Sequence, residues 1–147
     1  MAHKTKRTYY LELTAAFCLL LGGSIYLIFR RRTLIMFRYI PQKIISLLDN
    51  VGKNISLHDN SFTSFIIYNL PAGLWTISYL LVMHTICSDM SKIQRMLWLY
   101  LLPSVLLLVE ILQAFPFCRG TFDFIDILCY LIPIFVSLLI DKKNEKF

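Results

Sequence analysis

The stretch Glu110-Ile-Leu-Gln-Ala-Phe-Pro-Phe-Cys-Arg-Gly-Thr-Phe-Asp-Phe-Ile-Asp126 joins two long apolar runs, at about 96–115 and 122–140. Each run has about the 20 residues that a transmembrane helix needs. Two such runs on either side of a short polar link predict a helical hairpin across a membrane. Charged side chains near the middle of a bilayer cost about 2.5–3.5 kcal/mol each on insertion scales, and less toward its surface. The charged residues of this link therefore locate a candidate site.

The composition excludes an ordinary soluble domain. Of the 147 residues, 57% are hydrophobic, whereas soluble domains have about 45–50% apolar residues. The net charge of +6 comes largely from basic residues beside apolar runs, for example Arg30, Arg31 and Arg32 after the first run and Lys142 and Lys143 after the last. Such flanks are typical of contacts with lipid head groups. We therefore expect a single membrane domain over residues 1–147, in contact with membrane lipids and not with nucleic acid.

The hydropathy pattern predicts an all-α, polytopic membrane protein with four transmembrane helices, at about 9–29, 65–87, 96–115 and 122–140. Between the first two spans, residues 41–51 place their aliphatic side chains on one side of a helix. This segment is interpreted as an interfacial amphipathic helix lying on the membrane surface. The alternative is a plain connecting loop.

The orientation of the spans follows only weakly from charge. With four spans, both ends of the chain lie on one side, which has eight basic residues against seven on the other. The short link at 88–95 and the lysine-rich tail favour cytoplasmic termini and an outward-facing junction.

The cysteines are Cys18, Cys87, Cys118 and Cys129, and their spacing predicts neither a disulfide framework nor a zinc site. No metal or other cofactor is predicted.

Helical spacing groups the polar residues of the junction. Glu110 and Gln113 share a helix face, as do Asp123 and Asp126, and Tyr130 follows Asp126 by four residues. In an antiparallel hairpin these groups converge at one end, with Arg119 in the turn. The candidate ligand-binding residues are Glu110, Gln113, Arg119, Asp123, Asp126 and Tyr130.

Asp123 and Arg119 also have structural interpretations. Thr121 is expected to cap the last helix, which places Asp123 in the first turn of that helix, where the helix dipole favours an anion. Arg119 can pair bidentately with one carboxylate, which leaves at least one acid to bind a proton, a cation or another helix. A purely structural role for Asp123 therefore stays open.

The order Glu-x-x-Gln, Arg, Asp-x-x-Asp resembles the VanZ-like family of small bacterial membrane proteins. Asn69, Pro71 and Gly73 match a second motif of that family, an Asn followed by Pro-x-Gly, with a shorter spacing. The resemblance spans about 68–130. The chain departs from the family at Tyr130 and Pro133, where an Asn and a Gly are usual. The resemblance implies an envelope role in the bacterial inner membrane, within a family named for a member linked to antibiotic resistance, and it supplies no reaction.

Three functions are compatible with this pattern. The first is a non-catalytic site that binds an envelope lipid head group, a lipid-linked molecule or an antibiotic-like ligand. The second is a membrane-embedded enzyme acting on a lipid phosphate through paired carboxylates; against it, the chain has no Ser-His dyad, no HExxH and no Gly-rich phosphate loop. The third is a structural subunit whose polar groups hold two spans together, with a membrane protein partner or a second copy. His84 is expected at the opposite membrane face as an isolated interface residue.

Overall fold

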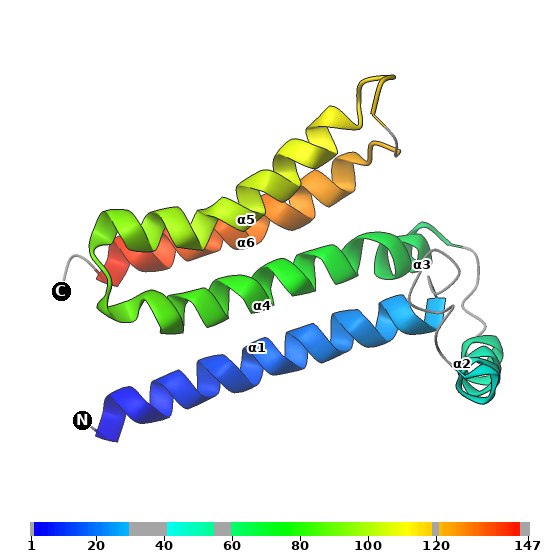
Figure 1. Ribbon diagram of the computed structural model, residues 1–147, viewed down its shortest axis with the longest axis horizontal. Coiled ribbons are helices and arrows are strands. Elements are labelled where there is room, and N and C mark those ends of the chain that lie inside the picture. Colours follow the sequence, from blue (N-terminus) through cyan, green and yellow to red (C-terminus); the bar gives the residue numbers. More distant parts are fainter. Residues whose placement is uncertain (1, 30–40, 55–59, 119–120, 145–147) are drawn as a thin grey trace.

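A computed structural model describes residues 2–29, 41–54, 60–118 and 121–144. Arg119 therefore lies outside the described residues. The described residues are almost entirely helical (Figure 1). The elements are α1 (Ala2–Phe29), α2 (Gln42–Asn54), α3 (Ser61–Ser64), a π-helix (Phe65–Asn69), α4 (Leu70–Ile86), a 3-10 turn (Cys87–Asp89), α5 (Lys92–Leu112) and α6 (Phe124–Asn144).

Four helical segments are long and apolar enough to cross a membrane, at Thr8–Phe29, Ser61–Asp89, Lys92–Leu112 and Phe124–Asp141. They confirm the predicted all-α class and the four spans. The third helix ends three residues earlier than predicted. Its last turn tightens at Gln113, whose backbone N–H reaches the carbonyls of both Val109 and Glu110, and turns continue to Cys118 around Pro116. Proline has no N–H to extend a helix, which explains the early end.

The polarity of the molecule is the reverse of that of a soluble protein. Among the described residues, the buried side chains include polar ones, such as Asn69 and Glu110, beside apolar ones, such as Leu80 and Leu99. The outer surface is instead apolar, and Leu20 is 70% and Ile93 80% exposed. Soluble monomers seldom expose continuous apolar surface on this scale. The surface fits a lipid environment.

The four long helices form a bundle in which α1 packs mainly on α4, and α4 also contacts α5 and α6. The start of α1 and the end of α6 lie at the same end of the bundle (Figure 1). Gly22 permits the close approach of α1 to α4, because a Cβ atom there would lie 2.8 Å from Nε1 of Trp75. Deeper in the interface, the Ser78 hydroxyl donates to the carbonyl of Ala15 at 2.8 Å. This hydrogen bond joins α4 to α1.

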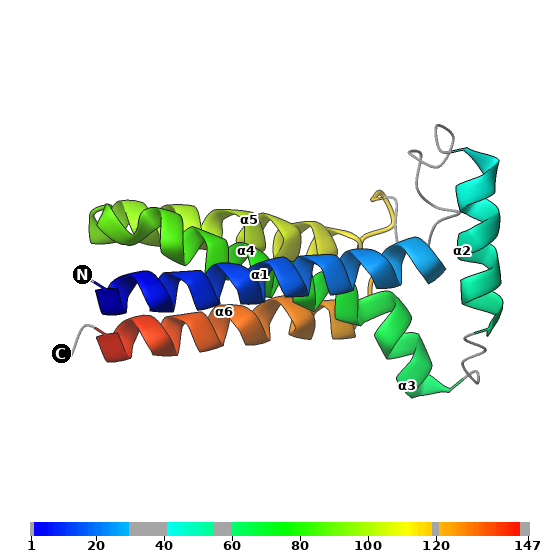
Figure 2. The ribbon, with the colours of Figure 1, turned by 90° about the horizontal axis from the view of Figure 1, so that it is seen from below.

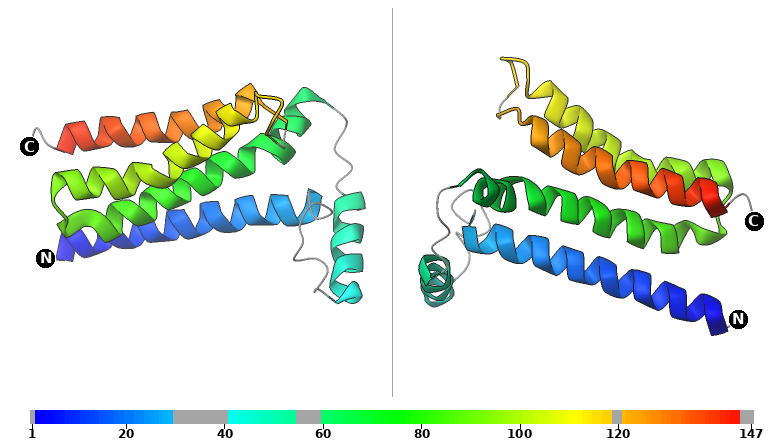
Figure 3. Two further views of the ribbon diagram at one scale, coloured as in Figure 1. Left: turned by 45° about the horizontal axis from the view of Figure 1, so that its top comes forward. Right: turned by 180° about the vertical axis from the view of Figure 1, so that it is seen from behind.

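The predicted amphipathic helix is present as α2. It lies crosswise to the bundle, beyond the end where α1 stops and α3 starts (Figures 2 and 3). Its apolar residues Ile44 and Leu47 are exposed. The helix begins after Pro41, whose carbonyl accepts from the N–H groups of Ile44 and Ile45 at 3.0 and 3.4 Å.

Candidate functional site

The site begins with an irregular turn at the start of the second span. Pro71 has no N–H, so the carbonyl of Ile67 cannot receive the usual helical bond. The backbone widens into a π-helix over Phe65–Asn69, and the N–H of Leu70 bonds to the carbonyl of Phe65. π-Helical turns are rare in proteins, and those that occur are often found at functional sites. This one ends on Asn69, whose side chain is only 3% exposed.

Asn69 links the second span to the fourth. Its amide nitrogen Nδ2 donates to Oδ2 of Asp123 at 2.8 Å and to Oδ1 of Asp126 at 2.9 Å. An amide NH₂ group has two hydrogens, so each carboxylate receives one. Sequence reasoning gave Asn69 only a supporting place in a motif, and the structure puts it at the centre of the junction.

Glu110 connects the third span to the same group. The backbone N–H of Asp123 donates to Oε1 of Glu110 at 3.0 Å, and Glu110 is 7% exposed. Oδ1 of Asp123 in turn accepts from the N–H of Ile125 at 2.9 Å. Asp123 is therefore the N-cap of α6, since a capping side chain accepts from the second or third helical residue. The prediction that Thr121 caps this helix is wrong, and the exposed Thr121 lies two residues ahead of the cap.

The hydrogen bonds join Asn69, Glu110, Asp123 and Asp126, which are called the acid cluster below. The predicted convergence of the three acids is confirmed. In the hydrogen bonds given above, the donor is either the Asn69 amide or a backbone N–H. Gln113 is half-buried at the C-cap of α5, three positions after Glu110.

A cavity of about 230 Å³ lies beside the acid cluster, where all four spans meet. Asp126 and Tyr130 of α6 form part of its wall, as the shared helix face predicted. Much of the remaining wall is aromatic, and the rings of Tyr26 and Trp75 lie 5.3 Å apart. The described lining residues are Tyr26, Tyr68, Pro71, Ala72, Trp75, Leu106, Asp126 and Tyr130.

The other two motif residues have packing roles. Pro71 is among the fully buried side chains and lines the cavity. Gly73, also buried, faces α6, and a Cβ atom placed on it would lie 3.5 Å from Cβ of Cys129. Both residues bring the start of α4 close to α6, which is what places Asn69 within reach of the two aspartates.

A larger hollow of about 410 Å³ lies elsewhere on α6 and has a different character. Its described lining is apolar and comes from one helix, with Leu131, Ile134 and Phe135 among the contributors. Ligand sites normally include a few polar groups that fix the orientation of the ligand. We assign this hollow to contact with lipid chains and treat the cavity beside the acid cluster as the candidate site.

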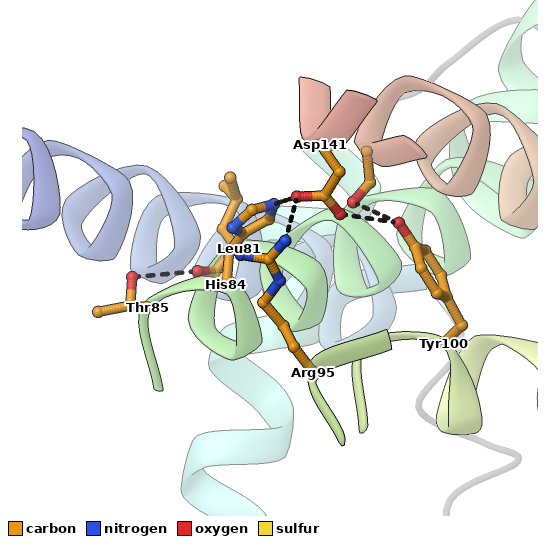
Figure 4. A network of polar contacts seen from close by, with 7 residues as sticks. Leu81, His84, Thr85, Arg95, Tyr100 and Asp141 are labelled. Carbon is orange, nitrogen blue, oxygen red and sulfur yellow. Dashed lines mark hydrogen bonds and ion pairs between the residues drawn. The ribbon is translucent and has the colours of Figure 1, made fainter. Parts of the chain in front are cut away.

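A second polar group lies near the opposite end of the bundle, and sequence reasoning missed it (Figure 4). Oδ1 of Asp141 lies 3.0 Å from Nε2 of His84 and 3.8 Å from Nη2 of Arg95. The first contact is short without being aligned as a hydrogen bond. Tyr100 donates to Oδ2 of Asp141 at 3.3 Å and lies 3.3 Å from the Ser137 hydroxyl. These five residues are called the Asp141 network.

The Asp141 network corrects the interpretation of His84 as an isolated interface residue. His84 is indeed far along the span from the acid cluster, but it is paired with a carboxylate that is 13% exposed. Asp141 is the first residue after the predicted fourth span, and Arg95 directly precedes the third. Because neighbouring spans are antiparallel, the end of the fourth span and the start of the third lie at the same end of the bundle. The sequence could therefore have predicted that Asp141 and Arg95 lie close together.

The fold and the acid cluster define an all-α protein whose four long helices can span a membrane and enclose a small polar cavity at one end. Comparison with protein-family models, with curated proteins and with solved structures finds no match for this chain. Among the described residues, no group of three or more His, Cys, Asp and Glu side chains is arranged to hold a metal ion.

Proposed function

We propose that the chain is a VanZ-like protein of the bacterial inner membrane that binds the polar head of an envelope lipid or a similar amphiphile. The observation that supports this most is the cavity beside the acid cluster, since it joins a carboxylate to aromatic walls at the meeting point of four spans. A site between spans suits a ligand whose tail stays in the bilayer. Its volume of about 230 Å³ is below the ~300–1,000 Å³ typical of drug-sized ligands. This favours a head group over a whole antibiotic.

The position of α2 supports a surface location for this site. The four spans run roughly parallel and α2 lies crosswise to them, at the end of the bundle that also holds the start of α4 (Figure 2). If the spans cross the membrane, a helix with this direction lies in the membrane plane. Exposed Ile44 and Leu47 would then enter the boundary between head groups and acyl chains, as in other interfacial helices.

The orientation that we propose has cytoplasmic termini and the acid cluster facing the envelope. Cys118, half-buried beyond α5, reports on that face once Cys18, Cys87 and Cys129 are replaced by alanine. We expect a membrane-impermeant thiol reagent to label Cys118 in intact cells. A cysteine-free chain carrying Lys6→Cys should be labelled only in inverted vesicles. The reverse pattern would place the acid cluster in the cytosol and contradict the envelope role.

Binding itself is tested with photoreactive lipids on the full chain in lipid nanodiscs. We expect Asp126→Asn to lower crosslinking at the cavity at least threefold at unchanged protein abundance, because this carboxylate forms part of the cavity wall. Phe135→Leu, on the lipid-facing hollow of α6, is the matched control and should leave crosslinking unchanged. Equal crosslinking in wild type and Asp126→Asn would argue against a binding site at the cavity.

A structural role for the acid cluster is the second candidate, favoured by the hydrogen bonds that join the π-helix and α5 to the start of α6. The two candidates differ in what a conservative change does to protein level. If the cluster serves only to hold spans together, Glu110→Gln and Asp126→Asn should lower membrane abundance and lipid crosslinking in the same proportion. Normal abundance with lost crosslinking supports the binding function.

A further inference from the structure

The first span carries an acidic side chain on its outer surface. Glu12 is exposed, and it lies inside the segment Thr8–Phe29, which is long and apolar enough to cross a membrane. In the described part of the chain, no hydrogen bond or ion pair reaches its carboxyl group. Acidic residues within transmembrane segments are rare, and they almost always pair with another group or face a protein interior. Because Glu12 does neither in the described structure, it indicates a contact of α1 with a second polypeptide.

Glu12 lies deeper in the bundle than the charged groups at the same end. The hydrogen bond from Ser78 places Ala15 level with Ser78, and α1 runs antiparallel to α4 (Figure 1). Toward the end that holds the Asp141 network, Glu12 is three positions, about 4.5 Å, from Ala15 along α1. In the same direction, His84 is six positions, about 9 Å, from Ser78 along α4. The backbone of Glu12 is thus about one helical turn further inside the bundle than that of His84.

Glu12 belongs to a row of residues with the spacing of a coiled-coil seam. Positions 9, 12, 16, 19 and 23 follow one another by three and four residues in turn, which is the repeat at which two helices pack side by side. The first four side chains of this row are exposed, and a Cβ atom placed on the fifth residue would have no neighbour within 4 Å. The row is called the α1 seam, and it consists of Tyr9, Glu12, Ala16, Leu19 and Gly23.

The packing of the bundle itself does not use the α1 seam. The helix packs mainly on α4, and Gly22 is the residue at which it lies against Trp75. Gly23, the next residue, faces a different side and has open space around it. Ala16, seven positions earlier, repeats a small side chain on that same side. Small residues allow transmembrane helices to approach closely, so the two neighbouring glycines suit two different interfaces.

A second copy of the chain fits the chemistry of the α1 seam. Copies of one chain insert in the same orientation, so two α1 helices meet in parallel and identical residues lie level across a two-fold axis. Two carboxyl groups that meet in this way can share one proton, because the protonated group donates and the ionised group accepts. One polar residue in an otherwise apolar seam also fixes the register and the number of helices.

We propose that two copies of this protein associate through their α1 seams, with the two Glu12 side chains sharing a proton and with Ala16 and Gly23 permitting the close approach. Each Glu12 then has the partner that it lacks within its own chain. The association does not depend on what the cavity beside the acid cluster binds.

Oxidative crosslinking in membranes tests which side of α1 faces the second copy. In the full chain with its four cysteines replaced by alanine, Leu19→Cys places a thiol in the seam, and Leu13→Cys places one on another side of α1. The two leucines are matched in exposure, at 54% and 55%. A disulfide requires Cβ atoms about 3.5–4.5 Å apart. We therefore expect at least fivefold more covalent dimer from Leu19→Cys than from Leu13→Cys.

The affinity is measured by energy transfer between donor- and acceptor-labelled full chains in liposomes, at increasing dilution of protein in lipid. We expect Glu12→Ala to weaken association about five- to thirtyfold, the range set by hydrogen bonds between model transmembrane helices. Glu12→Gln should stay within threefold of wild type, because an amide also both donates and accepts. Gly23→Leu should weaken association at least tenfold. Thr14→Val is the control and should have no effect, since the exposed Thr14 hydroxyl already donates to the carbonyl of Tyr10.

Three results would overturn this inference. Energy transfer at the level of random proximity at every dilution shows a monomer. Full affinity in both Glu12→Ala and Gly23→Leu shows that the copies meet through another surface. Equal crosslinking of Leu13→Cys and Leu19→Cys shows the same without altering Glu12, so the test holds even if a variant of Glu12 fails to fold. Lipid crosslinking at the cavity is measured separately, so a failure of this inference is distinguishable from a failure of the proposed function.

Discussion

Replacement of Asn69 by leucine tests the arrangement of the acid cluster most directly. Leucine has nearly the same size and shape as asparagine but no donor, so Asn69→Leu removes the bonds to Asp123 and Asp126 together. Interhelical hydrogen bonds in membrane proteins average about 0.6 kcal/mol and reach about 1.7 kcal/mol. Asn69 is 3% exposed and both acceptors are carboxylates, which places these bonds in the upper half of that range. We expect a loss of about 2–3 kcal/mol in the free energy of unfolding.

The assay is reversible unfolding of the full chain in mixed micelles with increasing amounts of denaturing detergent, followed by circular dichroism. Thr76→Val is the control, because Thr76 is equally buried in α4 but its hydroxyl bonds within the helix to the carbonyl of Ala72. Such a bond adds little to helix stability, so we expect less than about 0.5 kcal/mol. A loss below about 0.5 kcal/mol for Asn69→Leu would refute the central role assigned to this amide.

Three further substitutions test other contacts. Gly22→Ala should destabilise the protein by about 1–3 kcal/mol in the same assay, because the new methyl would overlap the indole packed there, whereas Gly23→Ala, with no neighbour within 4 Å, should be neutral. Asp123→Ala should lower the free energy of unfolding by about 1 kcal/mol more than Asp123→Ser does, since serine keeps the N-cap of α6. Equal losses would show that capping is unimportant. Asp141→Asn should leave the Arg95 guanidinium and the His84 ring facing a neutral amide in place of the carboxylate, and should lower stability by about 1–3 kcal/mol. His84→Gln should suppress part of this loss, and additive losses would contradict the pairing.

The parts of the fold that the sequence predicted depend on local patterns. Hydropathy is sufficient to locate four spans, and helical periodicity is sufficient to place Glu110, Asp123 and Asp126 at one end of a hairpin. The aliphatic spacing of residues 41–51 likewise predicted α2. Each of these depends on residues close together in sequence or on a single turn between neighbours.

The central place of Asn69 could not be predicted in the same way. The polar residues of the second span, such as Thr76, Ser78 and His84, do not share one side of the helix, so periodicity does not tell which side of it meets α6. That choice follows from tertiary packing, namely the turn that Pro71 imposes and the contact of Gly73 with Cys129. The capping role of Asp123 depends on where α6 starts, and helix ends are uncertain by one or two residues.

The spacing of the two polar groups along α6 has a consequence for the host membrane. Asp126 and Asp141 are fifteen positions apart on one helix, which corresponds to roughly 22 Å at 1.5 Å per residue. The hydrocarbon core of a typical bilayer is about 30 Å thick. One or both groups must then lie below the head-group boundary, unless the bilayer thins around the protein. Hydrophobic mismatch costs fractions of a kcal/mol per ångström, so bilayers with shorter acyl chains should suit this protein better.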